Sequence, residues 1–194
     1  MPRMKLSNLV FASSSREKYN EYKSLLGLTD LKLSEIIITE PQSMNLHYLA
    51  EEKIKEIRQK LLNTPFFVEH TGLIIDAWKG LPGGLTHVFM DTVGNEGILK
   101  MLSAYKGVQR SARAKVVIGY YHQSSGLQTF EGHISGTIAR KPRGLNNFGW
   151  DPIFIPVGQE KTYAEMDLEE KNRNSMRQEA AARFLRYLLQ HFEL

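Results

Sequence analysis

Residues 112–139, ARAKVVIGYYHQSSGLQTFEGHISGTIA, hold two segments rich in β-branched and aromatic residues. The first covers 112–122 and the second covers 127–139, with the turn-forming residues Ser124, Ser125 and Gly126 between them. Long β-rich segments around such a turn are typical of a hairpin. We therefore expect a long antiparallel hairpin in the second half of the chain.

Strands and helices alternate on the N-terminal side of this hairpin. The apolar patterns predict strands over 6–12, 31–39, 66–69 and 73–78, the last two flanking a Thr71-Gly72 turn, and helices over 16–26, 46–62 and 96–105. After the hairpin come a polar loop over 140–149, a short strand over 153–155 and a helix over 175–192. This order predicts a mixed α/β fold. No linker divides the chain, so a single domain over residues 1–194 is expected.

Composition narrows the class of protein. The chain has 194 residues, no cysteine and a net charge of +4. The lack of cysteine excludes a disulfide framework and a thiolate metal site, and it is compatible with the cytoplasmic location that we expect. No apolar run approaches the roughly 20 residues of a membrane helix, and the dispersed basic residues do not indicate nucleic-acid binding. The first 15 residues resemble a signal peptide in part, but a strand leading into a helix explains them better.

Residues 11–18, FASSSREK, have the pattern of an anion site, because a strand runs into a hydroxyl-rich turn and a helix start. Free backbone N–H groups and the helix dipole favour phosphate at such a place, and Lys18 adds a positive charge. Simple helix capping is the competing explanation, since Ser14 and Glu17 have the spacing of a capping box.

Residues 68–84, VEHTGLIIDAWKGLPGG, place Glu69 and His70 at the end of a predicted strand. Glu69 could hold a metal ion, although a lone carboxylate is a weak site for Mg²⁺. His70 could act as a general base, because the ordinary pKa of histidine is about 6.5. Both could also be strand-end residues without a chemical role.

Two later stretches complete the candidate site. In NNFGWDPIFIP, residues 146–156, Phe148 and Trp150 could stack on a base, or both rings could belong to the core. In KTYAEMDLEEKNRNSMR, residues 161–177, Lys171 lies in a polar loop and Arg177 falls in the first turn of the last helix. A cation there opposes the helix dipole, which indicates an acceptor-rich partner; a solvated charge run is the alternative.

Taken in order, these four stretches resemble the inosine triphosphate pyrophosphatase family, and the resemblance spans nearly the whole chain. FASSSREK is similar to the opening strand and turn of that family, and VEHTGLIIDAWKGLPG to its acidic segment and Gly-x-Pro-Gly loop. FGWDPIFIP and YAEMDLEEKNRNSMR resemble its two C-terminal motifs. The resemblance implies an elongated α/β fold of two lobes around a central nucleotide cleft, usually as a homodimer, and Mg²⁺-dependent cleavage of ITP, dITP and XTP to monophosphate and pyrophosphate.

The resemblance also implies roles for individual residues. Phosphate contacts would come from Ser13, Ser15, Lys18, Lys53 and Lys171. Phe148, Trp150 and Asp151 would enclose the purine and sugar, and Arg177 would donate to the 6-oxo group. Ser175, at the start of the last helix, is a further nucleotide-binding candidate. Glu69, His70 and Lys18 would then be the catalytic candidates, with Glu69 as the metal ligand.

The chain departs from the family where the family has carboxylates. His70 replaces an Asp, Tyr48 aligns with a metal-binding Glu, and Met176 replaces a His. The principal hypothesis is therefore a protein that binds a purine nucleoside triphosphate with little or no hydrolysis, as a sensing subunit for a partner effector, for instance in immune or stress signalling. The alternative is an active pyrophosphatase in which Glu40, Glu51 or Glu52 supplies the missing carboxylate, and an empty structural scaffold is the third interpretation.

Overall fold

A seven-stranded mixed sheet forms the centre of the molecule in the computed structural model, which describes residues 4–193. Its strand order is β3-β2-β4-β6-β7-β8, and the short β5 pairs with the edge of β4. The strands are β2 (Val10–Ala12), β3 (Lys32–Ser34), β4 (Phe66–Ile75), β5 (Pro82–Gly83), β6 (Ser111–His122), β7 (Gly126–Ile138) and β8 (Phe154–Pro156). β2, β3 and β4 run parallel, whereas β4, β6, β7 and β8 pair antiparallel.

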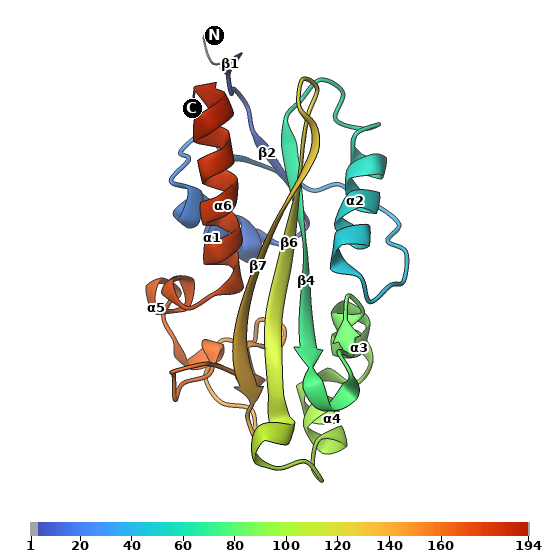
Figure 1. The fold of residues 1–194 in the computed structure, drawn as a ribbon, viewed down its shortest axis with the longest axis vertical. Helices are drawn as coiled ribbons and strands as arrows, with labels where there is room; N and C mark the ends of the chain where they lie inside the picture. The colour runs from blue at the N-terminus through green and yellow to red at the C-terminus, as the bar shows by residue number, and fades with distance from the viewer. Residues whose placement is uncertain (1–3, 194) are drawn as a thin grey trace.

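The helices cover both faces of this sheet (Figure 1). On one face lie α1 (Arg16–Leu26) and α6 (Met176–His191), with α5 (Leu168–Arg173) below them; α2 (Leu46–Ile57) covers the other face. At the far end of β4 lie α3 (Thr86–Thr92) and α4 (Gly94–Met101). Four 3₁₀ turns complete the chain, at Asp76–Trp78, Gly107–Arg110, Asp151–Ile153 and Tyr163–Glu165, and a short parallel pair joins β1 (Met4–Lys5) to β9 (Phe192–Glu193).

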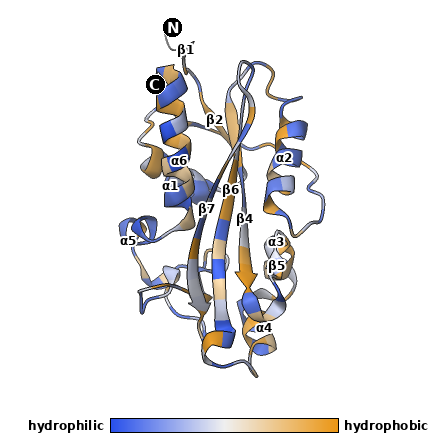
Figure 2. Cartoon of the chain, in the orientation of Figure 1, coloured by the Kyte–Doolittle hydropathy of each residue, from blue (hydrophilic) through white to orange (hydrophobic). Residues whose placement is uncertain are grey.

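Alternation along the central strands sorts side chains between the two helical layers. Val116 and Ile118 of β6 face the core under α1 and α6, whereas Val117 between them packs with Leu46 and Ala50 of α2. Figure 2 shows the resulting mixture of hydrophobic and hydrophilic residues along β6. Successive side chains of a strand point to opposite faces, so both helical layers are fixed by the same strand.

The sequence predicted the fold class and the hairpin, and the structure confirms both; the single domain of two lobes stays a prediction. The Thr71-Gly72 turn is wrong, because β4 pairs with β6 without a break from Phe66 to Ile75. Gly72 is needed there for another reason: a Cβ on it would lie 2.7 Å from the carbonyl oxygen of Gly83 in the neighbouring β5.

Several element bounds also differ from the sequence predictions. The strand expected over 31–39 is limited to Lys32–Ser34, and the helix expected over 46–62 ends at Ile57. The sequence missed α3 and α5, so the polar loop predicted around Lys171 is a helix. Within residues 4–193, no helix has the length and apolar character to cross a membrane, and the cytoplasmic location stays a prediction.

We expect the Phe184→Ala substitution to lower the free energy of unfolding by about 3–5 kcal/mol. Phe184 is fully buried, and its ring lies 5.2 Å from the rings of Phe67, Tyr120 and Phe130, so truncation leaves a cavity between α6 and the sheet. Urea unfolding measures the loss. Leu145→Ala is the control, because Leu145 is 97% exposed, and an equal loss in both variants would contradict the prediction.

Candidate functional site

A pocket of about 400 Å³ opens beyond the C-terminal ends of β2 and β3, along the part of β4 that these short strands leave unpaired. Its walls come from the start of α1, the 36–40 loop, α2, α3 and the 148–151 loop. Ten of the twelve residues predicted for the site line it: Ser13, Ser15, Lys18, Lys53, Glu69, His70, Phe148, Trp150, Asp151 and Arg177. The topology therefore brings four distant sequence stretches to one place.

The start of α1 forms the first wall. Ser15 is the N-cap, and its hydroxyl accepts a hydrogen bond from the backbone N–H of Lys18 at 3.2 Å. The backbone N–H of Ser15 in turn donates to the Ser13 hydroxyl at 3.1 Å. The capping residue predicted at Ser14 is therefore wrong by one position. The helix start directs its N–H groups and the Lys18 side chain toward the pocket, as an anion site requires.

Glu69 is the most heavily bonded carboxylate at the pocket floor. Its two oxygens accept a bidentate pair from Arg177 at 2.9 Å each, and bonds from the Tyr22 and Thr71 hydroxyls at 2.8 and 2.9 Å. Lys18 Nζ lies 2.9 Å from Glu69 Oε1. Burial opposes ionisation of Glu69, but the charges of Arg177 and Lys18 outweigh it and hold its pKa well below its ordinary value.

A second buried carboxylate, Glu21 of α1, links the two cations of the C-terminal motif. It accepts from Arg177 at 2.8 Å and from Lys171 at 2.9 Å, and Lys171 also donates to Asp151 at 2.6 Å. Lys171 is only 3% exposed and does not line the pocket. Its predicted phosphate contact is therefore not supported by its position, and it holds Asp151 and the ring of Phe148 instead, 5.1 Å from its Nζ.

The opposite wall carries His70, Glu40 and Lys53. Lys53 Nζ lies 2.9 Å from Glu40 Oε1, and His70 Nδ1 lies 3.4 Å from Glu40 Oε2. Burial raises the pKa of Glu40, but His70, where its ring is protonated, and Lys53 outweigh this and lower the pKa to about 2. Of the three glutamates considered as substitutes for the missing metal-binding carboxylate, Glu40 is the one that lines the pocket. Tyr48 of α2, which aligns with that carboxylate, is 42% exposed and lies outside the pocket.

The aromatic wall is partly core. Trp150 is 7% exposed and packs against Phe154 and Tyr163, with ring centroids 5.4 and 6.0 Å apart, yet it also borders the pocket with Phe148. Trp150 therefore belongs to the core and also borders the pocket, and its stacking on a base stays a prediction. Ser175 lies outside the pocket, where it caps α6 by accepting from the backbone N–H of Gln178 at 3.1 Å.

Sequence reasoning missed several residues of the site. Glu21, which lies behind the pocket and holds Arg177 and Lys171, could have been found, because it lies three residues after Lys18 on one helix face. Five missed residues of the pocket lining lie in the 36–40 loop and in α3, neither of which the sequence patterns predicted: Ile36, Ile38, His87, Met90 and Asp91.

The donor set does not fit a magnesium ion held by two carboxylates. In residues 4–193, no group of three or more His, Asp or Glu side chains is arranged to hold a metal ion. The oxygens of Glu69 already accept from Arg177, Tyr22 and Thr71. What remains beside Glu40 is a histidine nitrogen, and Mg²⁺ prefers oxygen ligands.

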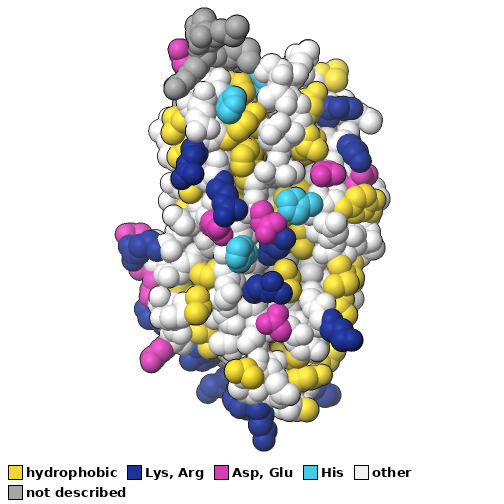
Figure 3. Space-filling view, viewed as in Figure 1, with side chains coloured by type: hydrophobic (Ala, Val, Ile, Leu, Met, Phe, Trp, Pro, Cys, Tyr) yellow, Lys and Arg dark blue, Asp and Glu magenta, His cyan; other side chains and the backbone are white. Residues whose placement is uncertain are grey.

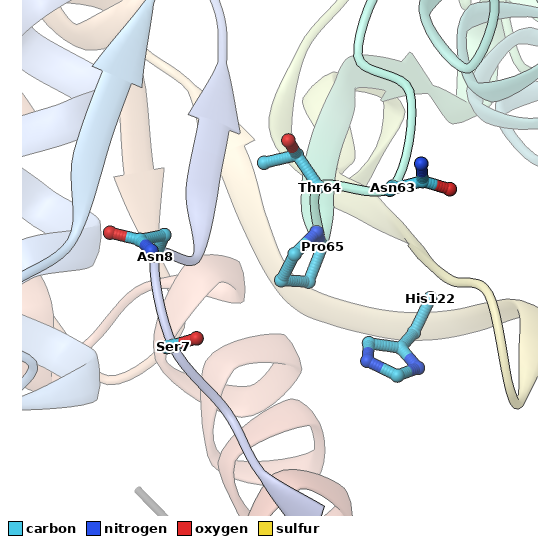
Figure 4. A pocket seen from close by; sticks show the side chains of 6 residues that line it. All are labelled: Ser7, Asn8, Asn63, Thr64, Pro65 and His122. Atoms are coloured by element: carbon cyan, nitrogen blue, oxygen red, sulfur yellow. The ribbon is translucent and has the colours of Figure 1, made fainter.

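Two other polar regions of the described chain are less suited to a charged ligand. A pocket of about 200 Å³ lies between the starts of β2 and β4 and the end of β6, and its lining contains no Lys, Arg, Asp or Glu (Figure 4): Ser7, Asn8, Asn63, Thr64, Pro65 and His122. Charged side chains also gather on the face shown in Figure 3. Among the half-buried charged side chains, Glu131 lies 2.7 Å from Lys115 and 2.8 Å from His47 Nε2, so the charge of Lys115 is already offset.

Fold and site together define an α/β protein whose cleft is lined by both cations and aromatic rings. The chain belongs to the Ham1 family, whose model matches residues 9–187. It is 38% identical over 185 residues to the dITP/XTP pyrophosphatase of Korarchaeum cryptofilum (strain OPF8), covering 95% of this chain and 97% of that protein. It is 37% identical over 191 residues to the inosine triphosphate pyrophosphatase of Aspergillus fumigatus (strain ATCC MYA-4609 / CBS 101355 / FGSC A1100 / Af293), covering 97% and 96%.

Solved structures agree with this assignment. The Ham1 protein of Staphylococcus aureus superposes with a TM-score of 0.80 at 26% identity, over 95% of this chain and 99% of that one. The family resemblance seen in the sequence motifs is thereby confirmed, as is the mixed α/β architecture.

We expect Glu69→Gln to lower the free energy of unfolding at pH 7 by about 3–5 kcal/mol, because Arg177 would lose its charged partner while still buried. The pKa values of Glu69 and Glu21 are lower in the folded chain than their ordinary 4.5. Their stabilisation is therefore fully present above about pH 4.5 and is lost as the pH falls below it.

Urea unfolding across pH 3–7 measures this. The wild type should lose stability steeply on acidification, and the Glu69→Gln variant less steeply. Glu169→Gln removes a carboxylate whose side chain is 82% exposed and should match the wild type throughout. Parallel acid profiles for wild type and Glu69→Gln would contradict the assignment of Glu69.

Proposed function

We propose that this chain hydrolyses a purine nucleoside triphosphate with a 6-oxo base, such as dITP or XTP, to the monophosphate and pyrophosphate. The observation that carries the proposal is the pocket itself, whose volume of about 400 Å³ is lined by Lys18 and Lys53 together with Phe148 and Trp150. The activities named for the Korarchaeum and Aspergillus relatives support the same reaction.

The phosphate end is built for a polyanion. Ser13, Ser15 and the first turn of α1 supply hydroxyl and backbone N–H donors, and Lys18 and Lys53 supply charge. Helix starts bind phosphate through these groups. Phosphoryl transfer depends chiefly on positioning and on neutralising the charge of the triphosphate, and both lysines would serve this purpose. Ser175 and Lys171, which we predicted to bind the nucleotide directly, would instead position the loop and helix around it.

The base end selects through Arg177. A guanidinium can only donate hydrogen bonds, and Glu69 and Glu21 fix its orientation. Hypoxanthine and xanthine present an acceptor at position 6, whereas adenine presents a donor, and a buried donor without an acceptor costs about 1–3 kcal/mol. Phe148 and Trp150 would stack on the ring without distinguishing the two.

Binding without hydrolysis is the second candidate, and His70 favours it. This residue stands where the family resemblance implies an Asp, and the carboxylate of the adjacent Glu69 is fully engaged with Arg177, Tyr22 and Thr71. A sensing role would require an effector partner, and a homodimer is expected from the resemblance alone. Because the relatives are named as pyrophosphatases, we place hydrolysis first.

One paired measurement separates the candidates. The protein is mixed with dITP in the presence of Mg²⁺, and in a parallel series Mn²⁺, and both bound nucleotide and released pyrophosphate are recorded, with dATP as the control. Release from dITP but not dATP is the expected result. Tight dITP binding without release would establish the second candidate, and neither binding nor release would overturn both.

Lys53→Ala should weaken dITP binding at least tenfold, because it removes a cation from the phosphate end of the pocket. The change is measured by calorimetric titration. Lys161→Ala is the matched control, since Lys161 is about half exposed and pairs with Glu170 outside the pocket. Equal affinities for Lys53→Ala and wild type would place the phosphates elsewhere.

A further inference from the structure

His70 carries a ring nitrogen that the fold leaves without a hydrogen-bond partner. Its Nε2 lies 2.9 Å from the carbonyl oxygen of Gly84. A carbonyl oxygen only accepts, so Nε2 carries the proton and Nδ1 of the neutral ring presents its lone pair. The residue is only 8% exposed, and Nδ1 is buried with no hydrogen-bond partner at the wall of the pocket.

Glu40 faces this nitrogen at a separation suited to a shared metal ion. His70 Nδ1 and Glu40 Oε2 are 3.4 Å apart, beyond the usual range for an N–H···O hydrogen bond. Two ligands that each lie about 2.0–2.2 Å from one metal ion, at tetrahedral or octahedral angles, are separated by about 2.8–3.6 Å. The other oxygen of Glu40 stays paired with Lys53 at 2.9 Å, which holds the carboxylate in place.

We propose that His70 Nδ1 and Glu40 Oε2 form a site for a divalent ion of the Co²⁺, Ni²⁺ and Zn²⁺ class rather than for Mg²⁺. Imidazole nitrogen suits these borderline ions, whereas Mg²⁺ selects oxygen. The bond from Nε2 to Gly84 fixes the ring and its tautomer, which is the usual support for a metal-binding histidine. The remaining coordination positions face the pocket, where water or phosphate oxygens can fill them.

Charge limits the affinity of this site when the pocket holds no anion. Lys53 and, across the pocket, Lys18 repel a cation, and only Glu40 offsets them on this wall. A polyphosphate in the pocket would remove that repulsion and supply further oxygen ligands. Metal affinity should therefore rise when inorganic triphosphate is added. Inorganic triphosphate is a suitable probe, because metal binding can then be measured without hydrolysis of a nucleotide.

His87 and Asp91 of α3 provide an internal comparison. Their Nε2 and Oδ2 atoms are also 3.4 Å apart and the residues also line the pocket, but both side chains are largely exposed. Neither has the fixed geometry that Gly84 and Lys53 give to His70 and Glu40. A histidine and a carboxylate at the same spacing thus serve as the control pair.

The test is a titration of the metal-free full chain with Co²⁺, with inorganic triphosphate present, followed by visible absorption and by equilibrium dialysis. We expect binding that an equal concentration of Mg²⁺ does not reverse. His70→Asn and Glu40→Gln should each weaken it at least tenfold, and His87→Gln should leave it unchanged. His70→Asp should narrow the preference for Co²⁺, so that less Mg²⁺ is needed to displace Co²⁺ than from the wild type.

Each outcome decides the proposal independently of hydrolysis. Displacement of Co²⁺ by equal Mg²⁺ from the wild type, unchanged binding in His70→Asn or Glu40→Gln, loss of binding in His87→Gln, or no binding at all would overturn it. Thermal melts confirm that each variant is folded. Glu40, whose side chain is 38% exposed, gives a decisive variant even where a change at the buried His70 prevents folding.

Discussion

The buried ion pair between Glu69 of β4 and Arg177 of α6 is the interaction on which the rest of the structure depends. It joins the central strand to the last helix across 108 residues of chain, and both side chains are at least 98% buried. Two buried charges are tolerated only when their hydrogen-bonding groups are also satisfied. Tyr22, Glu21, Lys18 and Lys171 provide this, and they draw α1 and α5 into the same cluster.

The lengths of the parallel strands create the space that this cluster surrounds. β2 pairs with β4 only at Phe66 and Phe67 and ends at Ala12, so the edge of β4 is open from Val68 to Gly72, before β5 pairs with Leu73 and Ile74. Side chains from the loops that follow β2 and β3 are directed into that opening. The pocket is therefore a consequence of two short strands beside one long strand, and the polar groups of α1, α6 and the 148–151 loop converge there without any change in the sheet.

The sequence was sufficient for features that depend on local pattern. The hairpin, α1 and the aromatic motif each follow from a contiguous stretch with its own period or turn chemistry. Features that depend on a partner far away were not predictable. The Thr71-Gly72 pair has turn-forming residues, but pairing with β6 along ten residues outweighs that preference. Lys171 has the composition of a solvated loop, and its burial is explained by two distant carboxylates, Glu21 and Asp151, which lie 150 and 20 residues away.

The alternation of β4 explains how two neighbouring residues come to serve different purposes. Glu69 and His70 are adjacent, so their side chains point to opposite faces of the strand. Glu69 is directed toward α1 and α6, where its charge is neutralised by cations that the fold requires. His70 is directed toward α2 and the 36–40 loop, where Glu40 and Lys53 lie. A substitution at position 70 therefore changes the chemistry of the pocket wall without removing a charge from the buried cluster, so a histidine at this position is compatible with an intact family fold.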